Sequence, residues 1–344
     1  MRCLGRILAG VGVAIGSLPC AAVGQLPQVG SLITTIGSLD SPEEEVFGEI
    51  TDVVLGEDRT LHVLDELNGT IRSFTTGGEF LGTFGQKGRG PGEFMGPLSA
   101  DRNGAGTLYV SDGDNLRLSM ISWRNGGLNL DATVRLESFP MEVCVLGDRM
   151  MTFQFIADGP LVTVLSLDGA KIGAFARREP PRGALALIPG TKDHLLYSAT
   201  SLACEPTVPS VVIAQHRQPI IRAFTPNGEL AWRAELEGFH ETGYATGPTQ
   251  RCCVASIPDP STGTYETVWS VVPDGRGQLL VSIEEYRPET RERTYEHRLL
   301  SAATGEELAR DEAPGIAVLI RDGLLVSKVR APVPQVLVHA WLAR

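Results

Sequence analysis

Short runs of alternating apolar and polar residues follow one another along most of the chain, and Gly, Asp and Asn residues separate them. Residues 55–74, LGEDRTLHVLDELNGTIRSF, contain two such runs, TLHVLD and TIRSF, each preceded by a turn sequence. Alternation with a period of two over four to eight residues indicates half-buried β-strands, whereas helices require a period near 3.6. The residues after Phe94 alternate in the same way and have no helical period. The pattern therefore predicts an all-β fold.

The residues from Phe47 onward match those from Phe94 onward without a gap, so the repeat is 47 residues long. Each unit reads as strand, turn, strand ending in Asp, Asn-containing loop, strand, Gly turn and strand. A four-stranded unit repeated at this length is typical of a β-propeller blade. The coinciding positions include Phe47/Phe94, Thr60/Thr107, Leu61/Leu108, Val63/Val110, Asp65/Asp112 and Asn68/Asn115. The paired Asp and Asn residues are expected to cap the turns between the second and third strands.

Glycine turns between the last two strands of a unit recur five times along the chain. They are TTGGEF, RNGGLN, LDGAKI, PNGELA and ATGEEL. A sixth unit begins at Gly315, but the chain ends after three of its strands. The segment from Ser31 to Gly37 resembles an outer strand and is expected to supply the fourth, which removes the open sheet edges. We therefore predict a six-bladed β-propeller of four-stranded antiparallel blades over residues 25–344, with the ring closed by the N-terminal strand.

The pattern GxxGxGPGEFxxP followed by LYVSDxxNxRL resembles the NHL repeat, and the similarity is clearest over residues 47–121. NHL-like propellers include secreted lyases, extracellular sensor domains and exported bacterial proteins. The resemblance implies that the glycine-rich segment GQKGRGPGEF, residues 85–94, links two blades, with Phe94 filling the gap between them. This segment lacks the Gly-Lys-Ser/Thr ending of a phosphate-binding loop. We therefore interpret it as a structural linker rather than an anion site.

Residues 1–24 read as a secretory signal peptide, with two arginines, an apolar run from Ile7 to Leu18 and a small-residue cleavage site before Gln25. The protein is thus expected to be exported, either periplasmic or secreted, with lipid attachment at Cys20 as the less favoured alternative. No later segment approaches the ~20 apolar residues of a membrane span. The formal net charge of −11 argues against binding to nucleic acid or anionic membranes. A monomer is expected.

Removal of the signal peptide leaves four cysteines, Cys144, Cys204, Cys252 and Cys253, in an oxidising compartment where disulfides persist. Cys204 lies in SLACEPTVPS, which reads as an insertion between the second and third strands of blade four. Cys252 and Cys253 lie in the long link into blade five. We expect one disulfide, from Cys204 to either Cys252 or Cys253, that joins the two loops. Cys144, in the apolar strand MEVCVL, is expected to be a buried free thiol.

The non-repetitive segments are expected to gather on one face of the propeller, around the mouth of its central channel. They are the insertion at 201–210, the link at 239–266 and the loop at 287–296. Loops on such a face often carry function. His240, Tyr244 and Arg251 in the link are the predicted ligand-binding residues, because aromatic and Arg side chains dominate binding hot spots.

Two classes of function remain. The first is non-catalytic binding of an extracytoplasmic protein, peptide or glycan; the chain has no HExxH or GxSxG motif, so no catalytic residue, metal ligand or cofactor is predicted. The alternative, which the NHL resemblance implies, is a metal-dependent lyase or lactonase-like hydrolase with Ca²⁺ or Zn²⁺ at the central channel. Glu49, Asp52, Ser99 and Glu142 are available on the inner strands, but no histidine accompanies them. Binding is therefore the favoured prediction.

Overall fold

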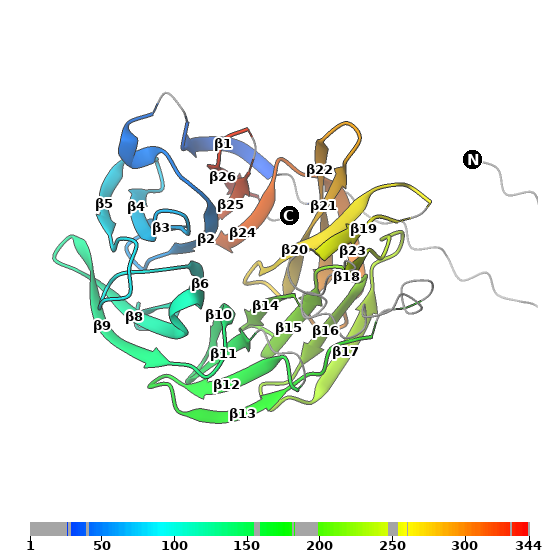
Figure 1. The fold of residues 1–344 in the computed structure, drawn as a ribbon, viewed down its shortest axis with the longest axis horizontal. Coiled ribbons are helices and arrows are strands. Elements are labelled where there is room, and N and C mark those ends of the chain that lie inside the picture. The colour runs from blue at the N-terminus through cyan, green and yellow to red at the C-terminus, as the bar shows by residue number, and fades with distance from the viewer. Residues whose placement is uncertain are drawn as a thin grey trace, which may run out of the picture.

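A computed structural model describes residues 26, 29–38, 41–154, 159–180, 182, 199–246, 254–259, 261–330 and 332–342. These residues form six four-stranded antiparallel sheets, arranged as the blades of a closed ring, and one additional two-stranded sheet (Figure 1). The predicted all-β, six-bladed propeller is thus confirmed. The predicted signal peptide, residues 1–24, lies outside the described residues.

The blades follow one another along the chain, each running from its innermost to its outermost strand. Blade one comprises β2 (Ile50–Leu55), β3 (Thr60–Asp65), β4 (Thr70–Thr75) and β5 (Phe80–Phe84). Blade two comprises β6 (Pro97–Arg102), β7 (Leu108–Asp112), β8 (Arg117–Arg124) and β9 (Gly127–Arg135). Blade three comprises β10 (Pro140–Leu146), β11 (Arg149–Gln154), β12 (Val162–Ser166) and β13 (Lys171–Phe175). Two short 3-10 helices, Glu43–Glu45 and Gly113–Asn115, lie in connections.

The second half of the chain completes the ring. Blade four comprises β14 (Thr200–Glu205), β15 (Ser210–Gln215), β16 (Ile220–Phe224) and β17 (Leu230–Glu235). The hairpin of β18 (Gly243–Thr246) and β19 (Val254–Ile257) precedes blade five, which comprises β20 (Tyr265–Pro273), β21 (Gln278–Arg287), β22 (Glu292–Ser301) and β23 (Glu307–Glu312). Blade six comprises β24 (Ile316–Arg321), β25 (Leu324–Val329), β26 (Gln335–Trp341) and the N-terminal strand β1 (Val29–Ile36).

The ring closes where the two ends of the chain share blade six, as predicted. Strand β1 pairs antiparallel with β26, with Thr34 opposite Val338 and Ile36 opposite Val336. Ile36 is buried and packs in one hydrophobic cluster with Val336 and Val338. A covered β26 has no free edge, so this pairing protects the sheet from association with other strands.

The glycine-rich segment 85–94 is a linker between blades one and two, as interpreted from the sequence. The Phe94 side chain is fully buried in a cluster that contains residues of both blades, including Ile71 and Val110. Glu93 accepts hydrogen bonds from the backbone N–H of Gly90, at 2.7 Å, and from the Gln86 side chain, at 2.8 Å. A carboxylate of the chain itself therefore takes the position that an anion would have needed.

The repeated aspartates fasten each blade to the connection that enters it. Asp65 accepts hydrogen bonds from the backbone N–H groups of Gly48 and Glu49, at 3.0 and 3.1 Å. It also caps its turn as predicted, because the Asn68 side chain donates to it at 2.7 Å. Asp112 repeats the arrangement in blade two, where the N–H groups of Met95 and Gly96 donate at 3.1 and 3.0 Å and Asn115 donates at 2.6 Å. Both carboxylates are completely buried, so their bonded partners are essential to their stability.

One prediction about blade four was wrong. Residues 201–210 were expected to form an insertion between its second and third strands, but residues 200–205 form β14, the innermost strand of the blade. All six residues of β14 are buried, so the strand lacks the polar alternation that marks a half-buried strand. Pro206 and Pro209, which suggested a loop, lie in the short turn to β15.

Candidate functional site

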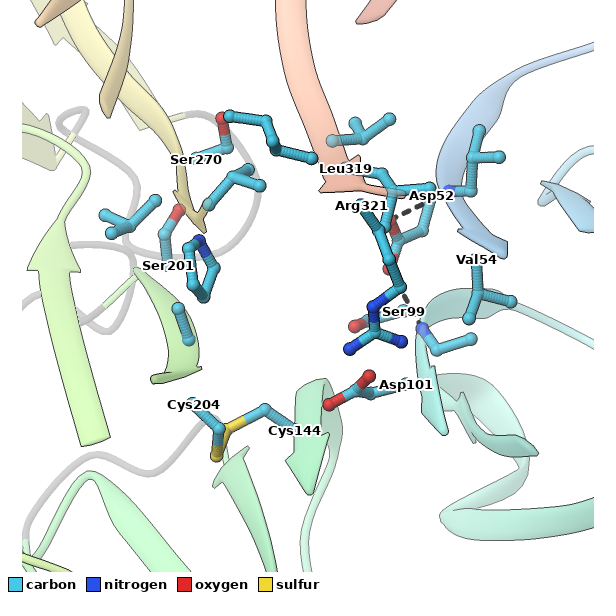
Figure 2. Close-up of a pocket in the computed structure, with 18 of the residues that line it drawn as sticks. Asp52, Val54, Ser99, Asp101, Cys144, Ser201, Cys204, Ser270, Leu319 and Arg321 are labelled. Carbon is cyan, nitrogen blue, oxygen red and sulfur yellow. Dashed lines mark hydrogen bonds between the residues drawn. A yellow bond between two sulfur atoms is a disulfide. The ribbon is translucent and has the colours of Figure 1, made fainter. Parts of the chain in front are cut away.

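The six innermost strands, β2, β6, β10, β14, β20 and β24, surround a central cavity of about 420 Å³ (Figure 2). Each of these strands belongs to a different sheet, so no strand is hydrogen-bonded to its inward edge. Backbone N–H and C=O groups on such an edge require other partners. Polar side chains on the inner strands are therefore expected to form hydrogen bonds with these backbone groups, whether or not they also take part in chemistry.

Side chains of one blade bind the inner-strand backbone of the next blade. The Asp52 carboxylate accepts a hydrogen bond from the N–H of Ala100, at 2.9 Å. Glu142 accepts one from the N–H of Leu202. The Ser270 hydroxyl donates to the carbonyl of Ala317, at 2.6 Å. These bonds hold blades together across the channel wall, which accounts for the polar residues that the sequence places on otherwise apolar strands.

Asp52, Glu142 and Lys328 are half-buried titratable side chains that line this cavity, together with the side chains of Asp101, Asp274, Asp322, Arg276 and Arg321. Burial raises the pKa of Asp52 to about 6. Burial, together with the nearby negative charge of Asp52, raises the pKa of Glu142 to about 8, so Glu142 holds its proton at neutral pH. The Lys328 amine donates a hydrogen bond to the carbonyl of Thr51. Titratable groups shifted in this way around a cavity are characteristic of functional sites.

An Arg–Trp pair lies beside the part of the channel where the inner strands begin. The Arg330 guanidinium lies over the Trp269 ring, 4.5 Å from its centroid, and forms a 3.0 Å ion pair with Glu49. The His216 ring lies 5.5 Å from Trp269, and its Nε2 lies 3.3 Å from the Ser201 hydroxyl. Burial lowers the pKa of His216 to about 3, so this histidine is neutral at physiological pH.

The sequence located part of this site. Asp52, Ser99 and Glu142, which were expected on the inner strands, do line the cavity. Lys328 and Trp269 also line it and were not singled out. Lys328 lies on β25, the second strand of its blade, so its inward position depends on the register between β24 and β25.

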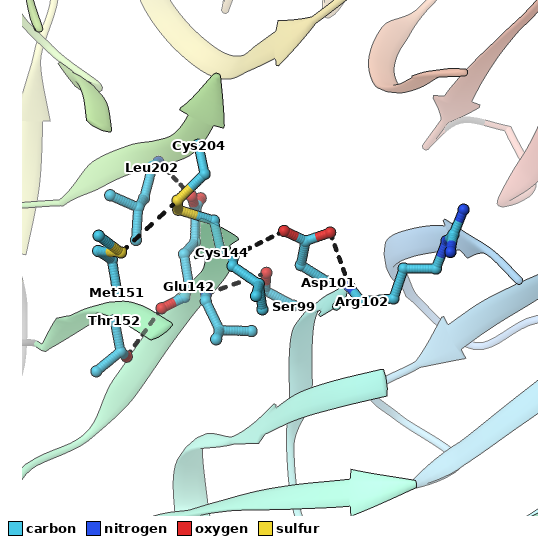
Figure 3. The surroundings of a disulfide bond; sticks show 11 residues. Ser99, Asp101, Arg102, Glu142, Cys144, Met151, Thr152, Leu202 and Cys204 are labelled. Carbon is cyan, nitrogen blue, oxygen red and sulfur yellow. Dashed lines mark hydrogen bonds between the residues drawn. A yellow bond between two sulfur atoms is a disulfide. The ribbon is translucent and has the colours of Figure 1, made fainter. Parts of the chain in front are cut away.

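The disulfide differs from the predicted one. Cys204 is bonded to Cys144, with 5.5 Å between their Cα atoms, so its predicted bond to Cys252 or Cys253 is wrong, as is the free thiol at Cys144 (Figure 3). Both cysteines lie on inner strands of adjacent blades, β10 and β14, and both line the cavity. Cys252 and Cys253 lie outside the described residues.

Blade five, together with Arg217 from the β15–β16 turn of blade four, forms an aromatic and cationic cluster. Its strands β20, β21 and β22 contain 9, 10 and 10 residues, more than most strands of the other blades. Tyr265 and Tyr286 stack with their ring centroids 6.2 Å apart. Arg293 lies over the Tyr286 ring at 4.5 Å and Arg217 over the Tyr265 ring at 6.0 Å. We call these four residues the blade-five surface.

The three predicted ligand-binding residues belong to the link beside this surface. His240 Nδ1 lies 2.8 Å from Glu266 Oε1, and its backbone N–H donates to Glu266 Oε2 at 2.9 Å. The hydrogen bond to Glu266 raises the pKa of His240. Glu266 directly follows Tyr265 in β20, so the link contacts this strand of blade five through His240. The backbone of Tyr244 belongs to β18, and Arg251 lies outside the described residues.

Metal-binding clusters and membrane-spanning helices are both absent from the part of the chain that the structure describes. Within it, no group of three or more His, Cys, Asp and Glu side chains is arranged to hold a metal ion. Nor does this part contain a helix with the length and apolar character needed to cross a membrane. The disulfide fits an exported protein, because such bonds persist in oxidising compartments.

Comparison with known proteins supports the fold. No family model matches the chain, and no curated protein matches its sequence, so membership of the NHL family is not confirmed. A member of the DUF4221 family from Bacteroides vulgatus has a similar structure, with a TM-score of 0.58 and 10% identity over 90% of this chain and 97% of that chain. A chain of the mitotic checkpoint complex has a TM-score of 0.51 and 8% identity, over 96% of this chain and 100% of that chain. Virginiamycin B lyase from Staphylococcus aureus has a TM-score of 0.42 and 10% identity, over 77% and 80%. The first two similarities show the fold alone, and fold does not define function.

Proposed function

We propose that the protein is an exported, non-catalytic propeller that binds a protein or peptide partner through the blade-five surface and the adjoining link. The observation that carries the proposal is the stack of Tyr265 and Tyr286 with Arg217 and Arg293 over their rings. Tyr and Arg residues dominate binding hot spots, because they bury a large area and still offer hydrogen bonds.

The stack is preorganised for binding. Arg293 is held over Tyr286 by a 2.5 Å ion pair with Glu284, whose side chain is buried. Side chains that already occupy fixed positions lose less conformational entropy when a partner binds. A protein partner is favoured over a glycan, because arginines cover ring faces that a sugar would otherwise stack against.

The proposal is tested by capture from the exported fraction with the mature protein as bait. Each captured partner is then produced separately and its affinity measured by calorimetry. We expect a Tyr286→Ala, Arg293→Ala double variant to lose about tenfold or more in affinity, the usual cost of removing hot-spot residues. The matched control removes an arginine and an apolar side chain from exposed outer-blade positions, Arg124→Ala with Ile172→Ala. That control is expected to bind as the wild type does.

Equal affinity of the double variant and the wild type would refute the blade-five surface as the binding site. Metal analysis of the purified protein tests the alternative function. Stoichiometric Ca²⁺ or Zn²⁺, together with turnover that a chelator abolishes, would replace the binding proposal with a metal-dependent lyase or lactonase-like hydrolase. Loss of binding in the double variant with no such turnover supports the proposal.

A further inference from the structure

Lys328 differs from the other lysines of this chain in its surroundings. The chain contains four lysines, Lys87, Lys171, Lys192 and Lys328, among 30 cationic residues. Lys171 is exposed on the outer strand β13, and Lys87 donates hydrogen bonds to the carbonyls of Glu66 and Met95. Lys192 lies outside the described residues. Lys328 alone among the described lysines lines the central cavity.

The charges around Lys328 come from several blades. Those that act on it are Asp52 of blade one, Glu49 just before that blade, Glu142 of blade three and Arg330 just after its own strand. Lys328 itself acts on His216 of blade four. Within the described part of the chain, no carboxylate forms an ion pair with its amine, and Thr51 supplies its hydrogen-bond acceptor. A buried ammonium without a direct counter-ion is costly.

Burial lowers the pKa of Lys328, although the negative charge of Asp52 opposes the shift. A larger fraction of this amine is therefore neutral at a given pH than at an exposed lysine. Only the neutral amine has the lone pair that attacks a carbonyl carbon, and buried lysines of this kind act as Schiff-base nucleophiles in enzymes.

We infer that Lys328 is a nucleophilic amine that forms a Schiff base with a small, uncharged hydroxycarbonyl compound in the central cavity. The Nζ lone pair attacks the carbonyl carbon, and one Nζ proton passes to the oxygen to give a carbinolamine. The hydroxyl then leaves as water with a proton from a donor, and the nitrogen lone pair forms the C=N bond. The second Nζ proton passes to the carboxylate that the donor has become. Glu142 lines the same cavity as Lys328 and holds its proton at neutral pH, so it is assigned as the proton donor.

The cavity lining selects the kind of carbonyl compound. Its volume of about 420 Å³ lies in the range of small-molecule sites. The hydroxyls of Ser99, Ser201 and Ser270 line it and can bind the hydroxyl groups of a ligand. The side chains of Asp52, Asp101, Asp274 and Asp322 line it beside those of Arg276 and Arg321, so carboxylates outnumber guanidinium groups and disfavour an anionic oxoacid. A neutral hydroxyaldehyde or hydroxyketone fits both features.

The inference is tested by reductive trapping in the wild-type protein. Glycolaldehyde and sodium cyanoborohydride are added over a pH series that spans neutrality, and the modified lysines are identified by peptide mass spectrometry. Hydride adds to the imine carbon and a solvent proton to the nitrogen, which makes the adduct permanent. We expect Lys328 to be modified several-fold faster than Lys171 near neutral pH, because burial lowers the pKa of Lys328 and leaves a larger fraction of its amine neutral.

The difference between the two lysines should shrink as the pH rises, because Lys171 then also becomes neutral. Pyruvate, as an anionic probe, should modify Lys328 more slowly than glycolaldehyde. Glu142→Gln should slow the modification of Lys328 and leave Lys171 unchanged, while Lys328→Arg should retain the charge and lose the adduct. The comparison of Lys328 with Lys171 needs no variant, so it holds even if a substitution disturbs folding.

Modification of Lys328 no faster than Lys171 in the native protein would overturn the inference. If a folded Glu142→Gln variant keeps the Lys328 reactivity of the wild type, the assignment of Glu142 as proton donor is wrong. The inference goes beyond the proposed binding function and does not depend on it. If the blade-five surface captures no partner, the result of the trapping experiment still stands. If Lys328 forms no adduct, the binding proposal still stands.

Discussion

Cys144 and Cys204 form a disulfide between the innermost strands of blades three and four, 60 residues apart in the sequence. No ladder joins these strands, because β10 and β14 belong to separate sheets. The hydrogen bond from the N–H of Leu202 to Glu142 lies on the same pair of strands. One covalent and one polar contact therefore fasten these two blades at the channel wall.

Removing the disulfide should destabilise the protein by about 2–4 kcal/mol, because the cross-link restricts the unfolded chain. The change is Cys144→Ser with Cys204→Ser, and the measurement is the free energy of unfolding in urea. Peptide mapping without reduction provides the direct control and should recover the Cys144 and Cys204 peptides linked together. A linked peptide that contains Cys204 and either Cys252 or Cys253 would contradict the structure.

Glu142 should make the protein less stable as the pH rises from 4.5 to 8. Its pKa is raised from 4.5 in the unfolded chain to about 8 in the fold, so the folded state holds a proton that the unfolded state releases in this window. The loss is on the order of 3 kcal/mol over the window. Glu142→Gln should abolish this part of the pH dependence, as measured by urea unfolding at both ends of the window.

Asp52→Asn is the matched control for Glu142→Gln. The pKa of Asp52 is raised from 3.8 to about 6, so Asp52 adds to the pH dependence of stability only up to about pH 6. Its removal should change the slope of stability below that pH. It should leave a smaller slope from pH 6 to 8, because the charge of Asp52 also helps to raise the pKa of Glu142. A stability profile of the Glu142→Gln variant that still falls from pH 6 to 8 would show that another group titrates there.

Asp112→Ala should cost about 2–4 kcal/mol of stability, because it leaves the buried N–H groups of Met95 and Gly96 without their acceptor and Arg117 without its ion pair. Thermal and urea unfolding measure the loss. The exposed neighbour Asp114 is the control, and Asp114→Asn should remain within about 0.5 kcal/mol of the wild type. Similar losses at both positions would indicate a general charge effect rather than the clamp at Asp112.

Ring closure should depend on one face of strand β1. Ile36→Ala removes a side chain that is 1% exposed and should destabilise the protein by about 2–5 kcal/mol. Ile33→Ala, on the same strand but 47% exposed, should cost less than about 0.5 kcal/mol. Equal, small effects of the two substitutions in thermal unfolding would mean that pairing of β1 with β26 adds little to the closed ring.

Some positions could be predicted from the sequence because their signals are local or repeated. The match of Asp65 with Asp112 located the turns, and the likeness of residues 31–37 to an outer strand located the ring closure. Blade four was misread because β14 is buried throughout, so it has no alternation for a pattern to detect. His240 was singled out, but its partner Glu266 was not, since nothing in the local sequence pairs residues 26 positions apart.

The sequence by itself determined the blade, the number of blades and the closure of the ring. Strand alternation, turn residues and a repeat can all be recognised in the sequence, because each is a pattern along the chain. Only the tertiary structure decided which side chains meet at the centre. Closure of the ring brings Asp52, Glu142 and Lys328 around one cavity and sets Cys144 opposite Cys204, and a disulfide forms only where such distances permit it. These residues are far apart along the chain, and burial, which gives their charged groups unusual pKa values, exists only in the folded ring.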